Sequence, residues 1–573
     1  MKKEIEALRD EMHKHGIDVY IVPTTDYHGS EYINDYFKCR EFLSGFTGSA
    51  GTLVVTADEA GLWTDGRYFL QAGNQLAGSG IQLMKMGEPG VPTVEEYLEN
   101  TMKDGMVLGF DGRVIDATFG KALAEKYQLK FKEDLTDLIW SDRPDVNPSE
   151  IYPVPLDVTG ETTESKLGRI RKAMEEEGAD YHLITTLNDV AWIYNLRADD
   201  VENTPVFYGY TLITKDSAKL YVMDEKLEKA DCAEVLPYDQ VITDLEALEE
   251  GSILINEAGI NYTILQAIPE QVKIINKPNP SEMMKAVKNE VEIRSTKHAH
   301  LKDGVAVVNF LYWVKKNVGK IPMTEISAAD YLHDCRAAQD GFHDLSFETI
   351  SGYGPNGAII HYAPTPETDA EIRPEGFLLV DSGGQYCDGT TDITRTIVMG
   401  PVTEEMKKHY TAVLRCHLKL AMAEFSPETL CTELDMMTRG PLHEMGLNYN
   451  HGTGHGVGHM LSVHEGPHSI SPRGGNSTMA PGMITSNEPG LYLEGKYGIR
   501  IETETLCYEK EPGVLALETI TLAPYERDAI NVDELSAEEI AWLNAYHKKV
   551  REALTPHLNG EVAEWLKEVT EEL

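Results

Sequence analysis

The sequence predicts an α/β protein in which two similar domains precede a third region of different construction. Residues 8–22 align without a gap on residues 170–184, and each copy reads as an amphipathic helix, a glycine at its C-terminal end and an apolar strand. The likeness recurs further along the chain, where 51–56 matches 209–214 and 62–67 matches 220–225. A duplicated α/β domain explains this repeat better than chance periodicity does.

Two breaks divide the chain into three predicted domains. The first break is residues 143–160, whose four prolines favour an extended linker. The second is residues 276–282, after which 281–316 has the pattern of a helix with Ser281 as its N-cap. We therefore predict domains at 1–157, 158–289 and 290–573, the last without a detectable copy of the first two.

The third region alternates helices with two hairpin-like pairs of strands. Residues 376–400 read as an apolar strand, a glycine-rich turn and a return strand of alternating character. Residues 483–509 repeat this pattern around Glu-Pro-Gly and Glu-Gly turns. Residues 535–558 predict a capped amphipathic helix, which we interpret as a packing element.

Composition excludes several classes of partner. The chain has 51 lysines and arginines against 94 aspartates and glutamates, and a net charge of −43 repels phosphate backbones and anionic membrane surfaces. We expect no nucleic-acid or membrane partner. The seven cysteines are scattered without a C-x-x-C pair, no run approaches 18 apolar residues, and the N-terminus lacks the apolar core of a secretory signal. These features predict a cytoplasmic protein.

Each predicted hairpin carries two carboxylates that folding can bring together. Asp381 follows the apolar run of the first strand and Asp392 lies on its return strand. Glu488 and Glu502 occupy similar places in the second hairpin. Any one of these acids could be a simple turn residue. Four carboxylates converging on an apolar surface would repel one another and lose hydration, and a divalent cation is the usual solution. With one neutral imidazole the set becomes a two-metal site.

The segment from 451 to 468 carries five histidines, of which the first three are separated by glycines at alternate positions. Glycine costs a helix about 1 kcal/mol per residue, so an extended or irregular backbone is favoured. An extended backbone places His451, His455 and His459 on one side, which is the geometry of a site wall. A polar loop rich in histidine is the alternative. The helical zinc motif H-E-x-x-H and the nucleophile motif G-x-S-x-G are both absent from the sequence.

Five ordered motifs then carry a resemblance to a known family: "GAIIHYAP", "DSGGQYCDGTTDITRT", "HGTGHGVGHMLSVHEGP", "NEPGLY" and "GIRIE". They resemble the pita-bread metallopeptidases, and among these the aminopeptidase P (Xaa-Pro aminopeptidase) family. "FTGSAGTLVVT", "WTDGRYFLQA", "LMKMGEPGVPT" and "NLRADDVENTPVFYGY" resemble the two creatinase-like amino-terminal domains of its long, three-domain form. The resemblance thus covers most of the chain. It implies a pita-bread catalytic domain in the third region.

Carried over by motif, the resemblance implies five metal ligands, two of them bridging carboxylates: Asp381, Asp392, His455, Glu488 and Glu502. Four oxygen ligands and one nitrogen favour hard or borderline ions, so we expect two divalent ions, Mn first and Zn or Co second. We assign the proton shuttle to Glu488, because a carboxylate beside the ions can reach both the attacking water and the leaving nitrogen.

The resemblance also implies residues that contact the peptide. His361 and His464 resemble substrate-contacting histidines, which would steady the oxyanion and the peptide carbonyl. His451 is expected to line the pocket of the proline ring. Arg500 is grouped with the substrate site and is expected to brace a ligand carboxylate. Arg67 resembles a position that contacts peptide from outside the catalytic domain.

The implied activity is release of the N-terminal residue from peptides with proline in the second position, by a chain that forms a homodimer. A prolidase, which cleaves Xaa-Pro dipeptides, would share the ligands but has one amino-terminal domain where this chain has two. A non-catalytic binding protein of this fold would have lost ligands, whereas all five are present. His459 and His468 have no implied role, and we expect them in a solvated loop.

Overall fold

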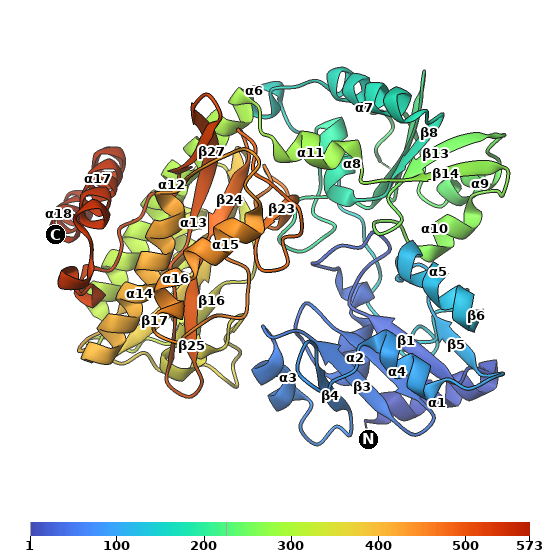
Figure 1. Ribbon diagram of the computed structural model, residues 1–573, viewed down its shortest axis with the longest axis horizontal. Coiled ribbons are helices and arrows are strands. Elements are labelled where there is room, and N and C mark those ends of the chain that lie inside the picture. Colours follow the sequence, from blue (N-terminus) through green and yellow to red (C-terminus); the bar gives the residue numbers. More distant parts are fainter. Residues whose placement is uncertain (1, 225) are drawn as a thin grey trace. The chain divides into compact units, whose positions relative to one another are not determined.

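The computed structural model describes residues 2–224 and 226–573, which form two compact units. The first unit comprises Met1–Pro155 and Glu161–Glu282, and the second comprises Leu156–Gly160 and Met283–Leu573 (Figure 1). Both units mix helices with sheets, so the predicted α/β class is confirmed. The domain boundaries at 157/158 and 289/290 stay a prediction.

The first unit holds two six-stranded sheets of the same construction. The first has the order β4-β3-β2-β1-β5-β6 and the second the order β12-β11-β10-β8-β13-β14. In each sheet the strand after the first helix pairs antiparallel with one neighbour and parallel with the other. The predicted pair of similar α/β domains is therefore confirmed by topology. The strands are β1 Val19–Pro23, β2 Thr52–Thr56, β3 Ala60–Thr64, β4 Gln82–Lys85, β5 Val107–Phe110, β6 Gln128–Lys130, β8 Tyr181–Ile184, β10 Gly209–Thr214, β11 Ala218–Val222, β12 Glu234–Pro237, β13 Gly251–Ile255 and β14 Val272–Asn276.

Both copies begin with a helix that ends at a glycine, as predicted. Helix α1 Lys3–His15 ends at Gly16 (φ 60°) and α7 Thr163–Glu177 ends at Gly178 (φ 69°). Glycine adopts this left-handed conformation without the steric penalty of a β-carbon, and it turns the chain into the following strand. The other helices of this unit are α2 Cys39–Ser44, α3 Phe69–Gln75, α4 Val94–Thr101, α5 Ala117–Lys126, α8 Leu187–Tyr194, α9 Gln240–Glu246 and α10 Tyr262–Ala267.

The two predicted breaks are more ordered than the sequence indicates. Within 143–160, β7 Tyr152–Pro153 pairs with β9 Leu196–Arg197, and α6 Leu156–Thr159 forms a single helical turn. The predicted helix 281–316 is in fact two helices, α11 Pro280–Ala286 and α12 Glu290–Asn317. Ser281 is buried inside α11 and is no N-cap.

Asn289 is the residue that starts the long helix. Its side chain accepts hydrogen bonds from the backbone N–H groups of Val291 and Glu292, and the Glu292 side chain accepts from the backbone of Asn289. This capping box satisfies backbone N–H groups of the first helical turn, which have no partner within the helix, so α12 begins there. Ser281 was a plausible cap by residue type alone.

The second unit contains a six-stranded sheet β21-β28-β27-β24-β22-β23, two three-stranded sheets, β16-β17-β20 and β15-β18-β19, and a two-stranded ribbon, β25-β26. The first predicted hairpin is confirmed, since β17 pairs antiparallel with β20 and Asp381 lies opposite Thr394. The strands are β15 Phe342–Leu345, β16 Ile350–Tyr353, β17 Phe377–Ser382, β18 Gly384–Tyr386, β19 Gly389–Thr390, β20 Ile393–Val398, β21 Glu424–Phe425, β22 Gly454–Gly456, β23 Glu465–Ile470, β24 Ile484–Asn487, β25 Gly490–Leu493, β26 Tyr497–Arg500, β27 Thr503–Glu511 and β28 Val514–Thr519.

The second predicted hairpin is broken at two places. Strand β24 pairs with β27, whereas β25 and β26 pair with each other as a separate ribbon. Glu488 lies between β24 and β25, and Glu502 lies between β26 and β27. Because Asn487 is opposite Thr503, both acids emerge from the same bend.

Long helices pack along these sheets (Figure 1). Helix α17 begins after Ser536, whose side chain and that of Glu539 form a capping box, so the predicted C-terminal helix is confirmed. The helices that complete the unit are α13 Glu325–Ala337, α14 Glu404–Ala421, α15 Cys431–Thr438, α16 Gly440–His443, α17 Ala537–Leu554 and α18 Gly560–Val569, and short 3₁₀ turns across the chain lie at Asp35–Phe37, Gly354–Ala358, Arg527–Ala529, Val532–Glu534 and Thr555–His557. Among the described residues, no helix combines the length and apolar character that a membrane crossing needs.

Two buried histidines predict a loss of stability in acid. Burial lowers the pKa of His547, in α17, to about 3, and that of His182, in β8, to about 4, against an ordinary value of 6.5. The unfolded chain therefore binds these protons more readily than the fold does. The stabilisation is complete above pH 6.5 and declines as the pH falls below it, by about 2 kcal/mol per histidine at pH 5.

Calorimetric melting between pH 7.5 and 4.5 measures this effect. In His547→Gln, an uncharged side chain can still accept the hydrogen bond that the backbone N–H of Tyr525 donates to His547 Nε2 over 3.1 Å. We expect the melting temperature of this variant to depend less on pH than that of the wild type. The exposed His557 provides the control, and His557→Gln should melt like the wild type at every pH. An unchanged pH dependence in His547→Gln contradicts the prediction.

Candidate metal centre

Asp381 lies at the end of β17, between β16 and β20, and is held by a buried arginine. Arg500, the last residue of β26, donates to Asp381 Oδ2 from Nη2 at 2.6 Å and from Nε at 3.0 Å. The other oxygen, Oδ1, is buried and has no hydrogen-bond partner among the described residues. Such an orphaned buried acceptor calls for a positive partner.

Asp392, His455 and Glu502 converge, each with one ligand atom, so that these atoms lie within 4.8 Å of one another. His455 is the central residue of the short strand β22, and its Nε2 lies 3.4 Å from Asp392 Oδ2. Its Nδ1 bonds the carbonyl of Gly456 at 2.8 Å, which requires the proton on Nδ1 and leaves Nε2 facing the carboxylates. Predicted residues from three separate segments thus meet in one place.

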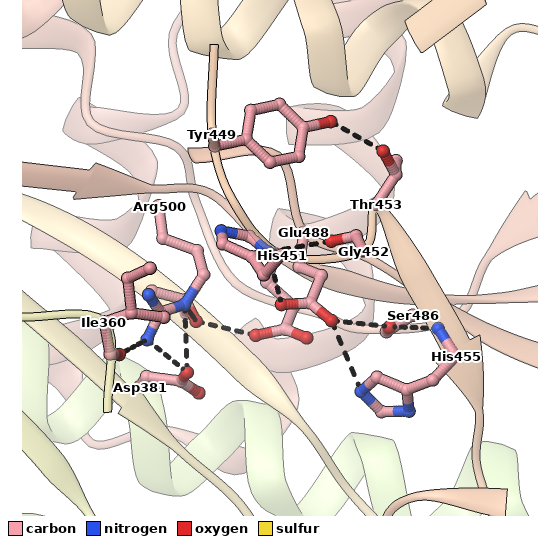
Figure 2. A network of polar contacts seen from close by, with 12 residues as sticks. Ile360, Asp381, Tyr449, His451, Gly452, Thr453, His455, Ser486, Glu488 and Arg500 are labelled. Carbon is pink, nitrogen blue, oxygen red and sulfur yellow. Dashed lines mark hydrogen bonds and ion pairs between the residues drawn. The ribbon is translucent and has the colours of Figure 1, made fainter. Parts of the chain in front are cut away.

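Glu488 joins the cluster from the bend after β24. Its Oε1 lies 3.5 Å from His455 Nε2 (Figure 2). Its backbone N–H donates to the carbonyl of Thr453 at 2.8 Å. Ser486 is shared by the two residues, since its hydroxyl accepts from the backbone of His455 at 2.9 Å and donates to Glu488 Oε1 at 3.4 Å. The bend therefore fixes Glu488 beside the imidazole.

The electrostatics of the cluster favour a cation. Burial raises the pKa of Glu502 well above its usual range, and the neighbouring charges of Asp392 and Asp381 raise it further. Burial also raises the pKa of Glu488 to about 7. Burial lowers the pKa of His455, but the carboxylates of Asp392 and Glu488 outweigh it and raise the value to about 9. Protonation is one response to such crowded negative charge, and a divalent cation is the other.

The five predicted ligands therefore fit a divalent metal. They supply four carboxylates and one imidazole with its Nε2 directed at them, and Asp381 Oδ1 is an unsatisfied acceptor. Oxygen-rich sets of this kind suit hard or borderline ions. Their role as ligands stays a proposal.

The histidines of the 451–468 segment have different surroundings. The His464 ring lies 4.4 Å from the His455 ring, centroid to centroid, at 85°. His451 Nε2 bonds the Tyr492 hydroxyl at 2.8 Å, and its Nδ1 is 3.6 Å from Glu488 Oε2. The expectation of a solvated loop for the other two is wrong, because His459 is 3% and His468 is 1% exposed.

Packing against glycine explains the burial of His468. A β-carbon at Gly456 would lie 2.7 Å from His468 Cε1 and 2.2 Å from the carbonyl oxygen of Glu465. Only glycine at position 456 lets the His468 ring and the Glu465 carbonyl come this close. The alternating glycines of the sequence predict close approach of some group but do not identify it. His468 Nε2 completes the contact by bonding the carbonyl of Ile484 at 3.0 Å.

Two further predicted residues come from segments that supply none of the five ligands. His361 follows the 3₁₀ turn Gly354–Ala358, next to Ile360, whose carbonyl accepts from Arg500 Nη2 at 3.2 Å. Arg67 belongs to the first unit, where its guanidinium pairs with Asp65 at 2.8 Å and lies 5.3 Å from the centre of the Tyr68 ring. The part of Arg67 in peptide binding stays a prediction.

Sequence reasoning missed two residues that support the cluster. Tyr492 places its hydroxyl between Arg500 Nη1, at 2.6 Å, and His451. Thr394 donates its hydroxyl to Glu502 Oε2 at 2.6 Å. Thr394 follows Asp392 by two positions at the start of β20, and this spacing places both side chains on one face of a strand. That signal was available, and Tyr492 is the last residue of the quoted "NEPGLY" motif, although no role was assigned to it.

Known sequence profiles match nearly the whole chain. Residues 294–509 match metallopeptidase family M24, and 513–573 match the C-terminal region of that family. Residues 4–143 and 142–292 each match the creatinase/prolidase N-terminal domain. The chain is also 38% identical to aminopeptidase P1 of Arabidopsis thaliana, over 100% of this chain and 99% of that protein.

The chain belongs to the aminopeptidase P group of metallopeptidase family M24. Solved structures agree. An X-prolyl aminopeptidase of Caenorhabditis elegans, described as a cytosolic enzyme with a di-nuclear active site, matches with a TM-score of 0.95 and 33% identity, covering 100% of this chain and 99% of its own. The prolidase of Pyrococcus horikoshii OT3 matches with a TM-score of 0.53 and 26% identity, covering 63% of this chain and 99% of its own. As a member of this M24 group, the chain is a metal-dependent hydrolase.

Proposed function

We propose that this chain is a dinuclear-metal aminopeptidase that releases the N-terminal residue from peptides with proline in the second position. The observation that carries the proposal is the convergence of Asp392, His455 and Glu502 beside Asp381 and Glu488. The C. elegans X-prolyl aminopeptidase matches the full length of the chain, whereas the P. horikoshii prolidase covers 63% of it. The Arabidopsis relative that matches the full length of the chain is likewise named an aminopeptidase, which favours an aminopeptidase over the alternative, a prolidase.

The proposed cofactor is a pair of divalent ions, held by Asp381, Asp392, His455, Glu488 and Glu502. Manganese is our first choice because four of the five ligands are carboxylates, and zinc or cobalt is the second. When bound, such ions polarise the scissile carbonyl and activate the attacking water.

We assign proton transfer to Glu488 on the basis of its access to the site. The Glu488 side chain is 18% exposed, against 10% for Asp381 and 5% for Asp392. Of these carboxylates it can best meet both a water molecule and the leaving nitrogen. The backbone of Glu488 is anchored to Thr453, and its carboxylate accepts from the Ser486 hydroxyl (Figure 2).

The remaining proposed roles concern the peptide. His464, beside His455, and His361 would donate to the developing oxyanion and to the peptide carbonyl. His451 would line the pocket for the proline ring, and Arg67 would contact the peptide from the first unit. Arg500 is 1% exposed and its guanidinium is engaged with Asp381, so we assign it to bracing that carboxylate.

The proposed setting is a cytoplasmic homodimer that acts on peptides. The C. elegans relative is described as cytosolic, and the scattered cysteines of this chain suit a reducing compartment. The net charge of −43 disfavours nucleic-acid and anionic membrane partners.

Product chromatography tests the proposal. The purified protein, loaded with Mn²⁺, is incubated in parallel with an Xaa-Pro dipeptide and an Xaa-Pro-Xaa tripeptide. Release of the single N-terminal residue from the tripeptide supports the aminopeptidase. Cleavage of the dipeptide alone makes the protein a prolidase.

A further inference from the structure

The stretch between His455 and His464 is fastened to two short segments that lead to the first unit. These connectors are Leu156–Gly160 and Met283–Asn289. Both connectors belong to the second unit. The chain on either side of Leu156–Gly160, and the chain that precedes Met283, belongs to the first unit. The connectors are also tied to each other, because Asn289 Nδ2 donates to the carbonyl of Thr159 at 2.9 Å.

His459 fastens the stretch to the first connector. Its Nε2 bonds the carbonyl of Val158 at 3.1 Å, and its Nδ1 lies 3.0 Å from the hydroxyl of Thr296, on α12. A carbonyl can only accept, so Nε2 carries a proton and a neutral ring accepts the threonine hydroxyl at Nδ1. The two contacts fix one tautomer and one orientation of a ring that is 3% exposed.

Glu465 fastens the other end of the stretch to the second connector. One oxygen accepts from Lys285 Nζ at 2.7 Å and the other from Lys288 Nζ. The three side chains are at most 5% exposed. The carboxylate of Glu465 compensates the charges of two buried ammonium groups, and its removal would leave both charges buried without this partner.

Both fastenings bear directly on His464. Glu465 is the next residue in the chain, and its backbone pairs with Gly456, the neighbour of His455. The stretch is therefore a closed loop whose two ends carry the His455 and His464 rings, 4.4 Å apart. Movement of the loop on its connectors would change the distance between these rings.

We propose that His459 and Glu465 are positioning residues, which set the place of His464 by fastening its loop to the two connectors. The proposal deepens the proposed function and rests on it, because His464 is assigned there to the peptide. It also gives His459 a role that the sequence did not indicate.

A mutant cycle on the Mn²⁺-loaded full-length protein tests the proposal. Glu465→Gln keeps the shape of the side chain and removes its charge, and we expect kcat to fall about 10- to 100-fold, as for other supporting partners of a site, with KM within about twofold. His459→Leu should have a smaller effect in the same direction, and His459→Gln, which keeps a donor for Val158, should restore most of it. In a His464→Ala background, Glu465→Gln and His459→Leu should each lower kcat by less than about twofold, because the residue through which they act is gone.

Lys510→Met is the matched control. Lys510, on β27, forms an exposed ion pair with Glu424, on β21 of the six-stranded sheet that also contains β22 and β23. Its loss should leave kcat unchanged. If Glu465→Gln lowers kcat as strongly in the His464→Ala background as in the wild type, the proposal is overturned. Should Glu465→Gln fail to fold, the same cycle with His459→Leu decides.

Hydrogen exchange, followed by mass spectrometry, separates this proposal from the proposed function. We expect amides of residues 456–464 to exchange at least about tenfold faster in Glu465→Gln and His459→Leu than in the wild type or Lys510→Met. This readout requires no cleavage, so it stands even if the wild type fails to cleave Xaa-Pro peptides. Unchanged exchange in both variants overturns the fastening.

Discussion

Asp392→Ala and His455→Ala are expected to lose activity while still folding. Each substitution removes one member of the three-residue cluster, and neither side chain is part of an apolar core. Lewis-acid stabilisation by a bound divalent ion is worth several kcal/mol, so kcat should fall at least about 1,000-fold. The measurements are peptide cleavage, metal content by mass spectrometry, and circular dichroism as the check on folding.

Asp388→Asn is the control for these variants. Asp388 lies in the same hairpin as Asp392 but pairs with Lys302 at 2.7 Å and with His298, outside the cluster. This variant should keep both activity and metal. Full turnover by a rigorously metal-free preparation would contradict the two-metal proposal, as would wild-type rates in His455→Ala.

Chelation of the wild type should have a second signature, in stability. The buried carboxylates of Asp381, Asp392 and Glu502 repel one another when no cation lies between them, as the raised pKa of Glu502 indicates. We therefore expect a chelator to abolish activity and lower the melting temperature, and Mn²⁺ to restore both. Asp392→Asn lacks one ligand carboxylate, so its melting temperature should respond less to the chelator and to Mn²⁺ than that of the wild type, and it should be inactive.

The sequence predicts the architecture well because the relevant signals are local. A helix that ends at a glycine before an apolar strand is written twice, at Gly16 and Gly178, and both copies fold as expected. The return strand after Asp392 is likewise marked by its alternating pattern. The exception is Ser281. Both Ser281 and Asn289 are residue types that suit an N-cap, but the long helix α12 begins at Asn289, which forms the capping box.

The site is predicted less completely because its support comes from distant segments. Lys285 and Lys288 read as surface lysines of a helix, and only the fold places Glu465 between them. His459 likewise looks solvated until Val158 and Thr296 are placed beside it. Such residues share no spacing with the ligands they support, so no pattern in a single sequence marks them.

The broken second hairpin shows why carboxylate positions could be predicted but their geometry could not. Glu488 and Glu502 are separated in the chain by β25 and β26, which pair only with each other. A continuous hairpin would instead run through these strands without a break. The pairing of Asn487 with Thr503 brings the two acids back to one bend. Register of this kind depends on pairing partners, and local propensity does not determine it.

Replacing the second-position proline by alanine should lower kcat/KM by about 10- to 200-fold, the range expected when a pocket shaped for a ring loses part of its apolar contact. Proline supplies no N–H, so a site that accepts it cannot depend on a hydrogen bond from that nitrogen. Its ring also fixes φ at about −65°. The site must recognise the ring itself, and His451, beside Tyr492 and Glu488, is the residue we assign to that pocket.

A blocked N-terminus should abolish cleavage altogether. The cluster gathers four carboxylates in a chain of net charge −43, and this field attracts the free α-ammonium of a peptide. Acetylation removes that charge and adds bulk where the N-terminal residue must fit. Chromatography of Ala-Pro-Ala, Ala-Ala-Ala and acetyl-Ala-Pro-Ala under one set of conditions measures both effects. Equal rates for the first two peptides would contradict the proline specificity. Cleavage of the acetylated peptide would show that the enzyme does not require a free N-terminus, because that peptide has the same Xaa-Pro bond and lacks only the α-ammonium charge.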